Sequence, residues 1–173
     1  MSLALLAVVC LAGLSIVVHS LRVGISPMPT SGAVRAVLLE QFPCELEGEL
    51  HELGAGWGSL ALPLAARCPK AQVVAWESSP VPFLVLWLRA RASGRSNLRL
   101  ERRNLFEADL RGASAVCCYL FTGAMTRLEP KLRAELKAGS LVVSHTFALR
   151  GWTPEATARV DDLYQTPVYR YRA

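Results

Sequence analysis

Apolar and polar positions along the chain form short blocks that predict strands and helices in turn. The apolar runs that read as strands lie at 50–53, 72–76, 98–101, 115–121 and 140–146. The segments that read as helices lie at 32–42, 59–67, 80–92 and 124–136. Strands that alternate with helices pair in parallel. The pattern therefore predicts a three-layer α/β sandwich with a mostly parallel sheet, followed by a β-hairpin at 159–172.

A long apolar segment precedes this predicted domain. Leu3 to Val18 contains no charged residue, and a helix of that length would reach roughly 24 Å. A signal peptide usually has a basic residue before the apolar run and a small-x-small cleavage site, which are not evident here. Apolarity on every side argues against a core helix. We interpret 1–21 as a hydrophobic membrane-anchor helix, 22–31 as a linker and 32–173 as the folded domain.

Composition and charge narrow the class of protein further. The chain has 173 residues, 52% of them apolar and 19% charged, with a net charge of +5. Its five cysteines include no CxxC pair, so neither a disulfide framework nor a metal site is expected, and a reduced compartment suits the chain. The positive-inside tendency places the domain on the cytoplasmic side of a membrane. The arginines at 89–103 are read as a solvated helix end or as attraction to anionic lipid; they lack the interleaved aromatics of a nucleic-acid surface.

Three glycines follow the first predicted strand, at Gly54, Gly56 and Gly58. A glycine-rich turn between a strand and a helix lets backbone amides face a ligand, as in many nucleotide sites. The dinucleotide fingerprint requires a third glycine where this chain has Ser59. A phosphate-binding P-loop requires a lysine that is absent from this turn. The loop therefore predicts a cofactor site that is not built for a pyrophosphate.

The order E-x-G-x-G-x-G, from Glu52 to Gly58, resembles motif I of class I methyltransferases that use S-adenosylmethionine. The resemblance implies a Rossmann-like fold in which the glycines lie under the cofactor and Glu52 holds its ammonium group. It also implies that Glu77, which closes the second predicted strand, accepts hydrogen bonds from both ribose hydroxyls. A carboxylate suits a vicinal diol because it offers two acceptor oxygens.

Two further cofactor contacts are implied by the same resemblance. The slot that recognises the adenine edge holds Asn104 and Leu105, where the family usually has an acidic residue, and Asp109 is an alternative. Thr30 is expected to contact the cofactor or the substrate, with a helix N-cap as the alternative interpretation of this residue.

The segments SPMPT before the domain and YLFTGAMTRLEPKLRAELKAGSLVVSHTFALRGW near its end resemble a narrower group. They are similar to the membrane-anchored protein-lysine methyltransferases of mitochondria and their prokaryotic relatives, whose substrates include the ATP synthase c-subunit and the adenine nucleotide translocator. The resemblance implies a lysine of a membrane protein as the methyl acceptor. Aromatic side chains are then expected to line the part of the site that holds the acceptor lysine, principally Tyr119, Phe147 and Trp152, with Phe121 beside them. The alternative is that these aromatic residues pack in the core of the domain.

Other functions stay open at this point. His145 is expected either to take a proton or to be a hydrogen-bonded structural histidine. The acceptor could be a small molecule, a lipid or a quinone, which the apolar segment also suits. A non-catalytic protein of the same fold, serving as a membrane assembly factor, is a third possibility. The sequence leaves the oligomeric state undetermined.

Overall fold

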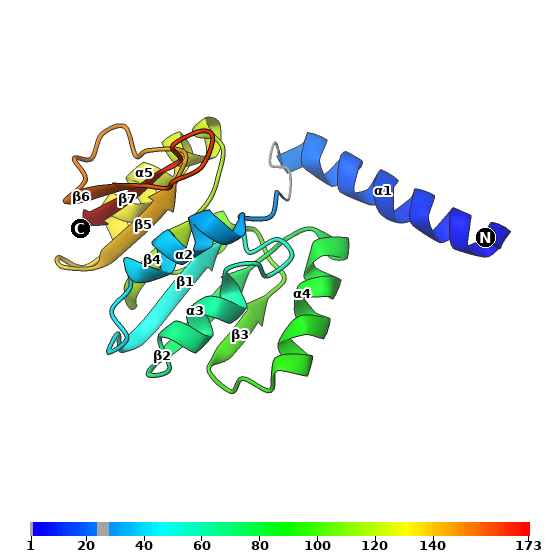
Figure 1. The fold of residues 1–173 in the computed structure, drawn as a ribbon, viewed down its shortest axis with the longest axis horizontal. Helices are drawn as coiled ribbons and strands as arrows, with labels where there is room; N and C mark the ends of the chain where they lie inside the picture. The colour runs from blue at the N-terminus through cyan, green and yellow to red at the C-terminus, as the bar shows by residue number, and fades with distance from the viewer. Residues whose placement is uncertain (1, 24–27) are drawn as a thin grey trace.

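The computed structural model describes residues 2–23 and 28–173, and its strands form one seven-stranded sheet (Figure 1). Five strands run parallel: β1 (Gly48–Leu53), β2 (Ala71–Trp76), β3 (Leu98–Glu101), β4 (Ala113–Cys118) and β5 (Leu141–His145). Two more, β6 (Ala156–Arg159) and β7 (Pro167–Arg172), pair antiparallel to their neighbours. The order across the sheet is β3-β2-β1-β4-β5-β7-β6. The predicted α/β fold with a mostly parallel sheet is confirmed.

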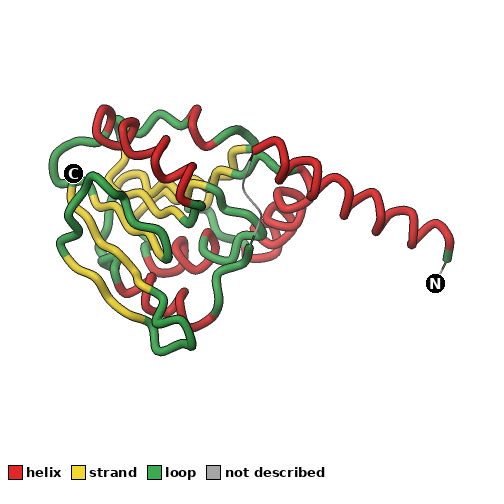
Figure 2. The backbone as a smooth tube through the Cα atoms, turned by 90° about the horizontal axis from the view of Figure 1, so that it is seen from above, coloured by secondary structure: helices red, strands yellow, loops and turns green. Residues whose placement is uncertain are grey.

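Helices lie on both faces of this sheet (Figures 1 and 2). One face packs against α2 (Gly32–Glu40), α3 (Ala61–Arg67) and α4 (Pro80–Ser93). The other packs against α5 (Thr122–Glu135), which buries Met125, Leu128 and Leu132 against β4, β5 and β7. The two adjacent cysteines, Cys117 and Cys118, are fully buried core residues. The chain between β3 and β4 contains only a short 3-10 turn, η1 (Leu105–Glu107).

Most predicted boundaries are off by one or two residues, and two larger differences have local reasons. The fourth strand ends at Cys118 and not at Phe121, because Phe121 is already the N-cap residue of α5. The tail does form a hairpin, but its first strand precedes residue 160. Residues 160–166 are a loop, in which the Asp162 carboxylate accepts hydrogen bonds from the Thr166 amide at 2.8 Å and hydroxyl at 2.7 Å.

The apolar N-terminal segment forms a helix, α1 (Leu3–Val23), that extends away from the sheet (Figure 1). Several of its apolar side chains are exposed, among them Leu11, Leu14 and Val17. Across the described residues, no helix combines the length and the apolarity that crossing a bilayer requires. The predicted membrane-spanning anchor at 1–21 is therefore not supported, and part of the predicted linker, residues 24–27, lies outside the described residues.

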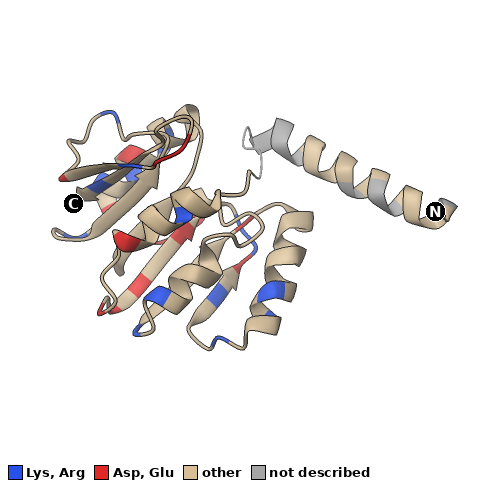
Figure 3. Ribbon diagram, viewed as in Figure 1, with Lys and Arg blue, Asp and Glu red and all other residues tan. Residues whose placement is uncertain are grey.

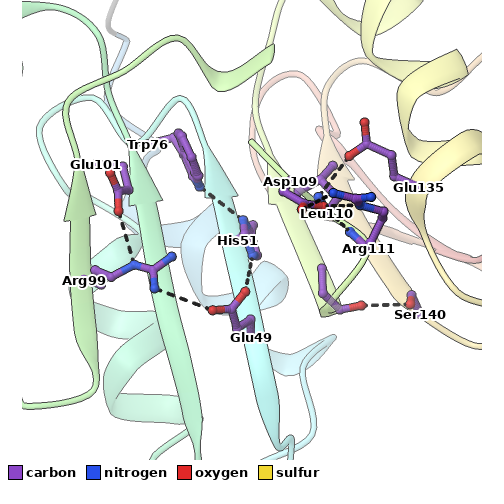
Figure 4. A network of polar contacts seen from close by, with 11 residues as sticks. Glu49, His51, Trp76, Arg99, Glu101, Asp109, Leu110, Arg111, Glu135 and Ser140 are labelled. Carbon is purple, nitrogen blue, oxygen red and sulfur yellow. Dashed lines mark hydrogen bonds and ion pairs between the residues drawn. The ribbon is translucent and has the colours of Figure 1, made fainter. Parts of the chain in front are cut away.

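Polar side chains occupy the α5 side of β1 and β3, where Arg99 bridges two carboxylates (Figure 4). Its guanidinium lies 3.7 Å from Glu49 and 3.3 Å from Glu101. Behind them, the indole N–H of Trp76 donates to Nδ1 of His51 at 3.1 Å, and His51 Nε2 lies 3.0 Å from Glu49. Burial lowers the pKa of His51, so the imidazole is neutral with its proton on Nε2. This network fixes the Trp76 ring at the carboxyl end of β2.

Candidate functional site

A cavity opens at the carboxyl ends of β1, β2 and β4, where the strand order reverses direction. Such a switch point is where open α/β sheets bind their ligands, because the two connections that leave it diverge to opposite faces. The residues that line the cavity are Met28, Thr30, Glu52, Leu53, Gly54, Ala55, Gly56, Trp57, Ser59, Leu60, Trp76, Glu77, Ser78, Ser79, Arg103, Asn104, Leu105 and Tyr119. Most of the residues predicted from the sequence to hold a cofactor are among them.

The glycine loop presents bare backbone to this cavity. The amides of Gly54 and Ala55 donate to the Trp76 carbonyl, at 3.0 and 2.8 Å, which ties the loop to the end of β2. Gly56 has a φ of +53°, and a Cβ built on it would meet no protein atom within 4 Å. The space above Gly56 therefore belongs to the cavity.

Gly58 is glycine for a different reason. Its φ is +77°, and a Cβ there would lie only 2.6 Å from Cδ1 of Leu86 on α4. Gly58 does not line the cavity. The structure gives this residue a packing role between loop and helix, and not the cofactor contact that the sequence predicted.

Glu77 connects the loop to the start of α4. One carboxylate oxygen accepts from the Gly56 amide at 2.8 Å and the other accepts from the Ser79 amide at 2.6 Å. Each carboxylate oxygen has a second lone pair, so both can also accept from a ligand hydroxyl. The carboxylate is largely buried and lines the cavity, in an orientation suited to a diol.

Glu52 is a buried carboxyl group with an unused oxygen. The residue is 3% exposed, and its Oε2 has no hydrogen-bond partner among the described residues. Burial raises the pKa of Glu52 well above its usual range, and the nearby Glu77 carboxylate adds to the effect. An orphaned buried acceptor is costly, and a cationic group in the cavity would remove that cost. The ammonium group of S-adenosylmethionine fits this requirement.

Thr30 and His145 meet at the β4 side of the cavity, although 115 positions separate them. Thr30 Oγ1 lies 3.3 Å from His145 Nε2, while Thr146 Oγ1 lies 3.1 Å from His145 Nδ1. The N-cap of α2 is Ser31 and not Thr30, and Thr30 lines the cavity. The Tyr119 ring stacks on the His145 ring with 3.9 Å between centroids. Desolvation lowers the pKa of His145 to about 4, which keeps the imidazole uncharged at neutral pH.

The remaining predicted residues divide between the cavity and its surroundings. Asn104 and Leu105 line the cavity, and Asn104 Oδ1 also caps η1 by accepting from the Phe106 amide at 3.1 Å. Phe147 lies behind the cavity and stacks against Tyr119 with 6.4 Å between centroids. Trp152 packs on Tyr171 instead, 6.1 Å away, and does not line the cavity.

Sequence reasoning missed several residues of the site. Ser59 accepts from the Thr30 amide at 3.4 Å, and the Ser79 amide helps to hold Glu77. Arg103 lines the cavity directly before Asn104. The position of Arg103 shortly after the end of β3 was the available signal, because residues that follow the parallel strands β1, β2 and β4 also line the cavity. No local pattern marks Ser59 as the partner of a residue that precedes α2. Asp109, the alternative adenine contact, pairs with Arg111 at 2.7 Å and does not line the cavity.

The switch point of this mostly parallel sheet holds a glycine loop with exposed backbone, a buried carboxyl group without a partner, and a carboxylate that can accept from a diol. This combination defines a class I methyltransferase that uses S-adenosylmethionine. An RNA methyltransferase from Salinibacter ruber, solved in complex with S-adenosyl-L-homocysteine, is 30% identical, and the match covers 84% of this chain and 93% of that one with a TM-score of 0.73.

The chain belongs to the ANTKMT methyltransferase domain family, whose match covers residues 52–156, more than half of its length. It is 29% identical over 136 residues to a protein-lysine N-methyltransferase of Saccharolobus islandicus, a match that spans 78% of this chain and 84% of that protein. It is 33% identical over 110 residues to the adenine nucleotide translocase lysine N-methyltransferase of Mus musculus. That match spans 63% of this chain but only 48% of the mouse protein.

Proposed function

We infer that this chain transfers the methyl group of S-adenosylmethionine to a lysine side chain of a protein. The observation that carries the inference is Glu52, whose buried Oε2 has no partner among the described residues and would be satisfied by the ammonium of that cofactor. Two relatives named as lysine methyltransferases, from an archaeon and from mouse, favour lysine as the acceptor. The family match and the cavity together make S-adenosylmethionine the methyl donor.

Each cofactor residue has a role that its position supports. Glu52 would neutralise the ammonium, Glu77 would accept from the ribose hydroxyls, and the bare backbone at Gly56 would let the cofactor approach the loop. Asn104 and Leu105 would border the adenine, and Thr30 would close the cavity on the β4 side. When bound, the cofactor supplies a methyl group activated by a positively charged sulfur.

The acceptor side is proposed to be the wall around Tyr119. A lysine amine attacks only after losing a proton, because the free pKa of its ammonium is about 10.4. A dry wall lowers that pKa by disfavouring the charged form. Tyr119 with Phe147 behind it offers apolar surface, and the uncharged His145 adds no positive charge to repel the ammonium. Trp152, predicted to form part of this wall, packs on Tyr171 and is not assigned to the wall.

Methyl transfer itself needs no further group from the protein. The bound cofactor would supply its methyl group to the deprotonated lysine nitrogen, with S-adenosylhomocysteine as the product. The proton lost earlier passes to solvent. The chain contributes alignment of the two reactants, which can lower the barrier by several kcal/mol.

A membrane location is proposed for the enzyme. The exposed apolar side chains of α1, including Leu5, Leu11 and Leu14, support association with a bilayer. Association would place the catalytic domain near lysines of membrane proteins and raise their local concentration without new contacts.

RNA is the second candidate acceptor, because the Salinibacter ruber structure of the same fold is named as an RNA methyltransferase. Labelling a membrane extract with cofactor that carries a tritiated methyl group separates the candidates. We expect protease-sensitive label that yields N-methyl-lysine on hydrolysis, and no label with Gly56→Val as the enzyme. Label lost to ribonuclease would assign RNA, and label extracted into organic solvent would assign a lipid or quinone. Cofactor binding without any labelled product would contradict an enzymatic role.

Cofactor binding is expected to release a proton and to tighten as the pH rises. Burial favours the protonated form of Glu52 in the free chain, whereas a bound ammonium favours the carboxylate. The pKa of Glu52 is then lower in the complex, so the complex holds fewer protons and affinity increases with pH between the two pKa values. Calorimetry in buffers of different ionisation enthalpy should show release of up to about one proton for the parent chain. The Glu52→Gln variant should bind without releasing this proton. If the parent chain gives the same binding enthalpy in all buffers, the assignment of Glu52 to the ammonium group is contradicted.

A further inference from the structure

Helix α4 exposes apolar side chains that its packing does not use. Leu84, Trp87 and Leu88 are 55%, 41% and 53% exposed. Their spacing of three and four residues places them on one side of the helix. Leu86, in contrast, is fully buried against the glycine loop and α3. We call the exposed set, Leu84, Trp87 and Leu88, the outer face of α4.

The surroundings of the outer face are basic. Arg91 lies one turn after Trp87, with its guanidinium carbon 5.4 Å from the indole ring centre, and Arg95 follows the helix. Arg89 donates to the Trp57 carbonyl at 2.6 Å. Between positions 78 and 97 the sequence contains no acidic residue, and Figure 3 shows α4 with basic positions alone. An apolar strip edged only by cations is complementary to an anionic lipid surface.

Helix α4 also contacts the apolar N-terminal helix α1. α1 carries exposed apolar side chains of its own, such as Leu14 and Val17. Both of these contacting helices therefore expose apolar side chains. Exposed apolar side chains on two contacting helices match the surface of a bilayer better than a small binding site on a partner protein.

We propose that the outer face of α4 lies on the surface of an anionic membrane, with Leu84, Trp87 and Leu88 among the acyl-chain ends and Arg91 and Arg95 at the headgroups. Tryptophan settles at this depth because its ring is apolar and its N–H is polar. Arginine reaches headgroup phosphates while its aliphatic stem stays in contact with the apolar layer.

The contact would orient the cofactor cavity. Ser78 and Ser79 line the cavity and lead directly into α4, so the cavity lies at the end of the helix that touches the membrane. A lysine close to the bilayer surface would then be within reach of Tyr119. This consequence rests on the proposed function, whereas the membrane contact itself does not.

Spin labels on the full-length chain test the contact directly. The label is placed at Leu88→Cys, with Ala138→Cys as the matched position on the far side of the domain, both in a Cys10→Ala, Cys44→Ser background. In vesicles of phosphatidylcholine and phosphatidylglycerol, the label at 88 should be relaxed more by oxygen than by a water-soluble nickel chelate, and the label at 138 should show the reverse. Bound protein with a water-exposed label at 88 would overturn the proposal while leaving association through α1 intact. Dipolar broadening of the label at 88 without vesicles would assign the face to a second copy and would also overturn it.

A charge test uses the same vesicles. Replacing Arg91 and Arg95 together by glutamine should weaken partitioning about 30-fold, since each basic residue near an anionic surface contributes about 1 kcal/mol. The control, Lys137→Gln with Arg111→Gln, removes the same charge elsewhere and should change partitioning less than threefold. Equal losses in the two double variants would contradict a localised contact. Neither readout involves methyl transfer, so the result is independent of the identity of the acceptor.

Discussion

Replacing Glu77 by alanine is expected to weaken binding of S-adenosylhomocysteine by about a hundredfold or more. Two effects combine, because the carboxylate is proposed to accept from both ribose hydroxyls and also holds the amides of Gly56 and Ser79. A hydrogen bond to a charged group contributes about 1.5–3 kcal/mol, so losing the two ligand contacts alone accounts for this magnitude. Titration calorimetry of the parent and variant chains measures it.

Glu101→Ala is the matched control for this prediction. Glu101 also ends a neighbouring strand, but it pairs with Arg99 on the opposite side of the sheet and does not line the cavity. We expect its affinity for the cofactor product to remain within about threefold, because a partly exposed ion pair contributes little. A Glu77→Ala chain that keeps both parental affinity and parental melting temperature would refute the ribose assignment.

Gly56→Val and Gly58→Val are expected to fail in different ways although only one residue separates the two positions. At Gly56 a Cβ meets no protein atom within 4 Å, so the valine side chain should extend into the cavity and abolish cofactor binding. The fold should lose only the cost of a positive φ, about 1–2 kcal/mol. At Gly58 the same strain adds to a collision with Leu86, and overpacking costs about 1–3 kcal/mol more.

Thermal unfolding and calorimetry on both glycine variants separate these outcomes. Gly58→Val should show the larger fall in melting temperature, and any loss of affinity should follow from the distorted loop. Gly56→Val should remain folded at room temperature and bind no cofactor product. Normal binding by the Gly56 variant would place the cofactor elsewhere in the molecule.

The sequence predicted the site where its signals were local. Glu52 lies in β1 directly before the glycine turn, and Glu77 follows β2. The strand pattern and the resemblance to motif I therefore sufficed to place them at one edge of the sheet. Strands of Val, Ala and Leu alternating with helices likewise predicted parallel pairing, which the structure confirms. These features depend on neighbours in the chain, which is why they could be read from it.

The parts that escaped prediction depend on distant neighbours. Thr30 and His145 are brought together only by the placement of α2 over β5. The packing role of Gly58 depends on Leu86, a residue of the following helix. Trp152 was predicted to join the acceptor wall as an aromatic residue of the resembling segment, but in the structure it packs on Tyr171 of β7. Such contacts follow from tertiary packing and leave no periodic trace in the sequence.

The hydrogen bond between Trp76 and His51 has an optical consequence. Trp76 is largely buried but lines the cavity, and its indole N–H donates to a buried imidazole. This hydrogen bond holds the fluorophore in place, so an adenine nucleoside that enters the cavity is expected to change the surroundings of the indole ring. We therefore expect cofactor occupancy to be readable from tryptophan emission without any attached dye.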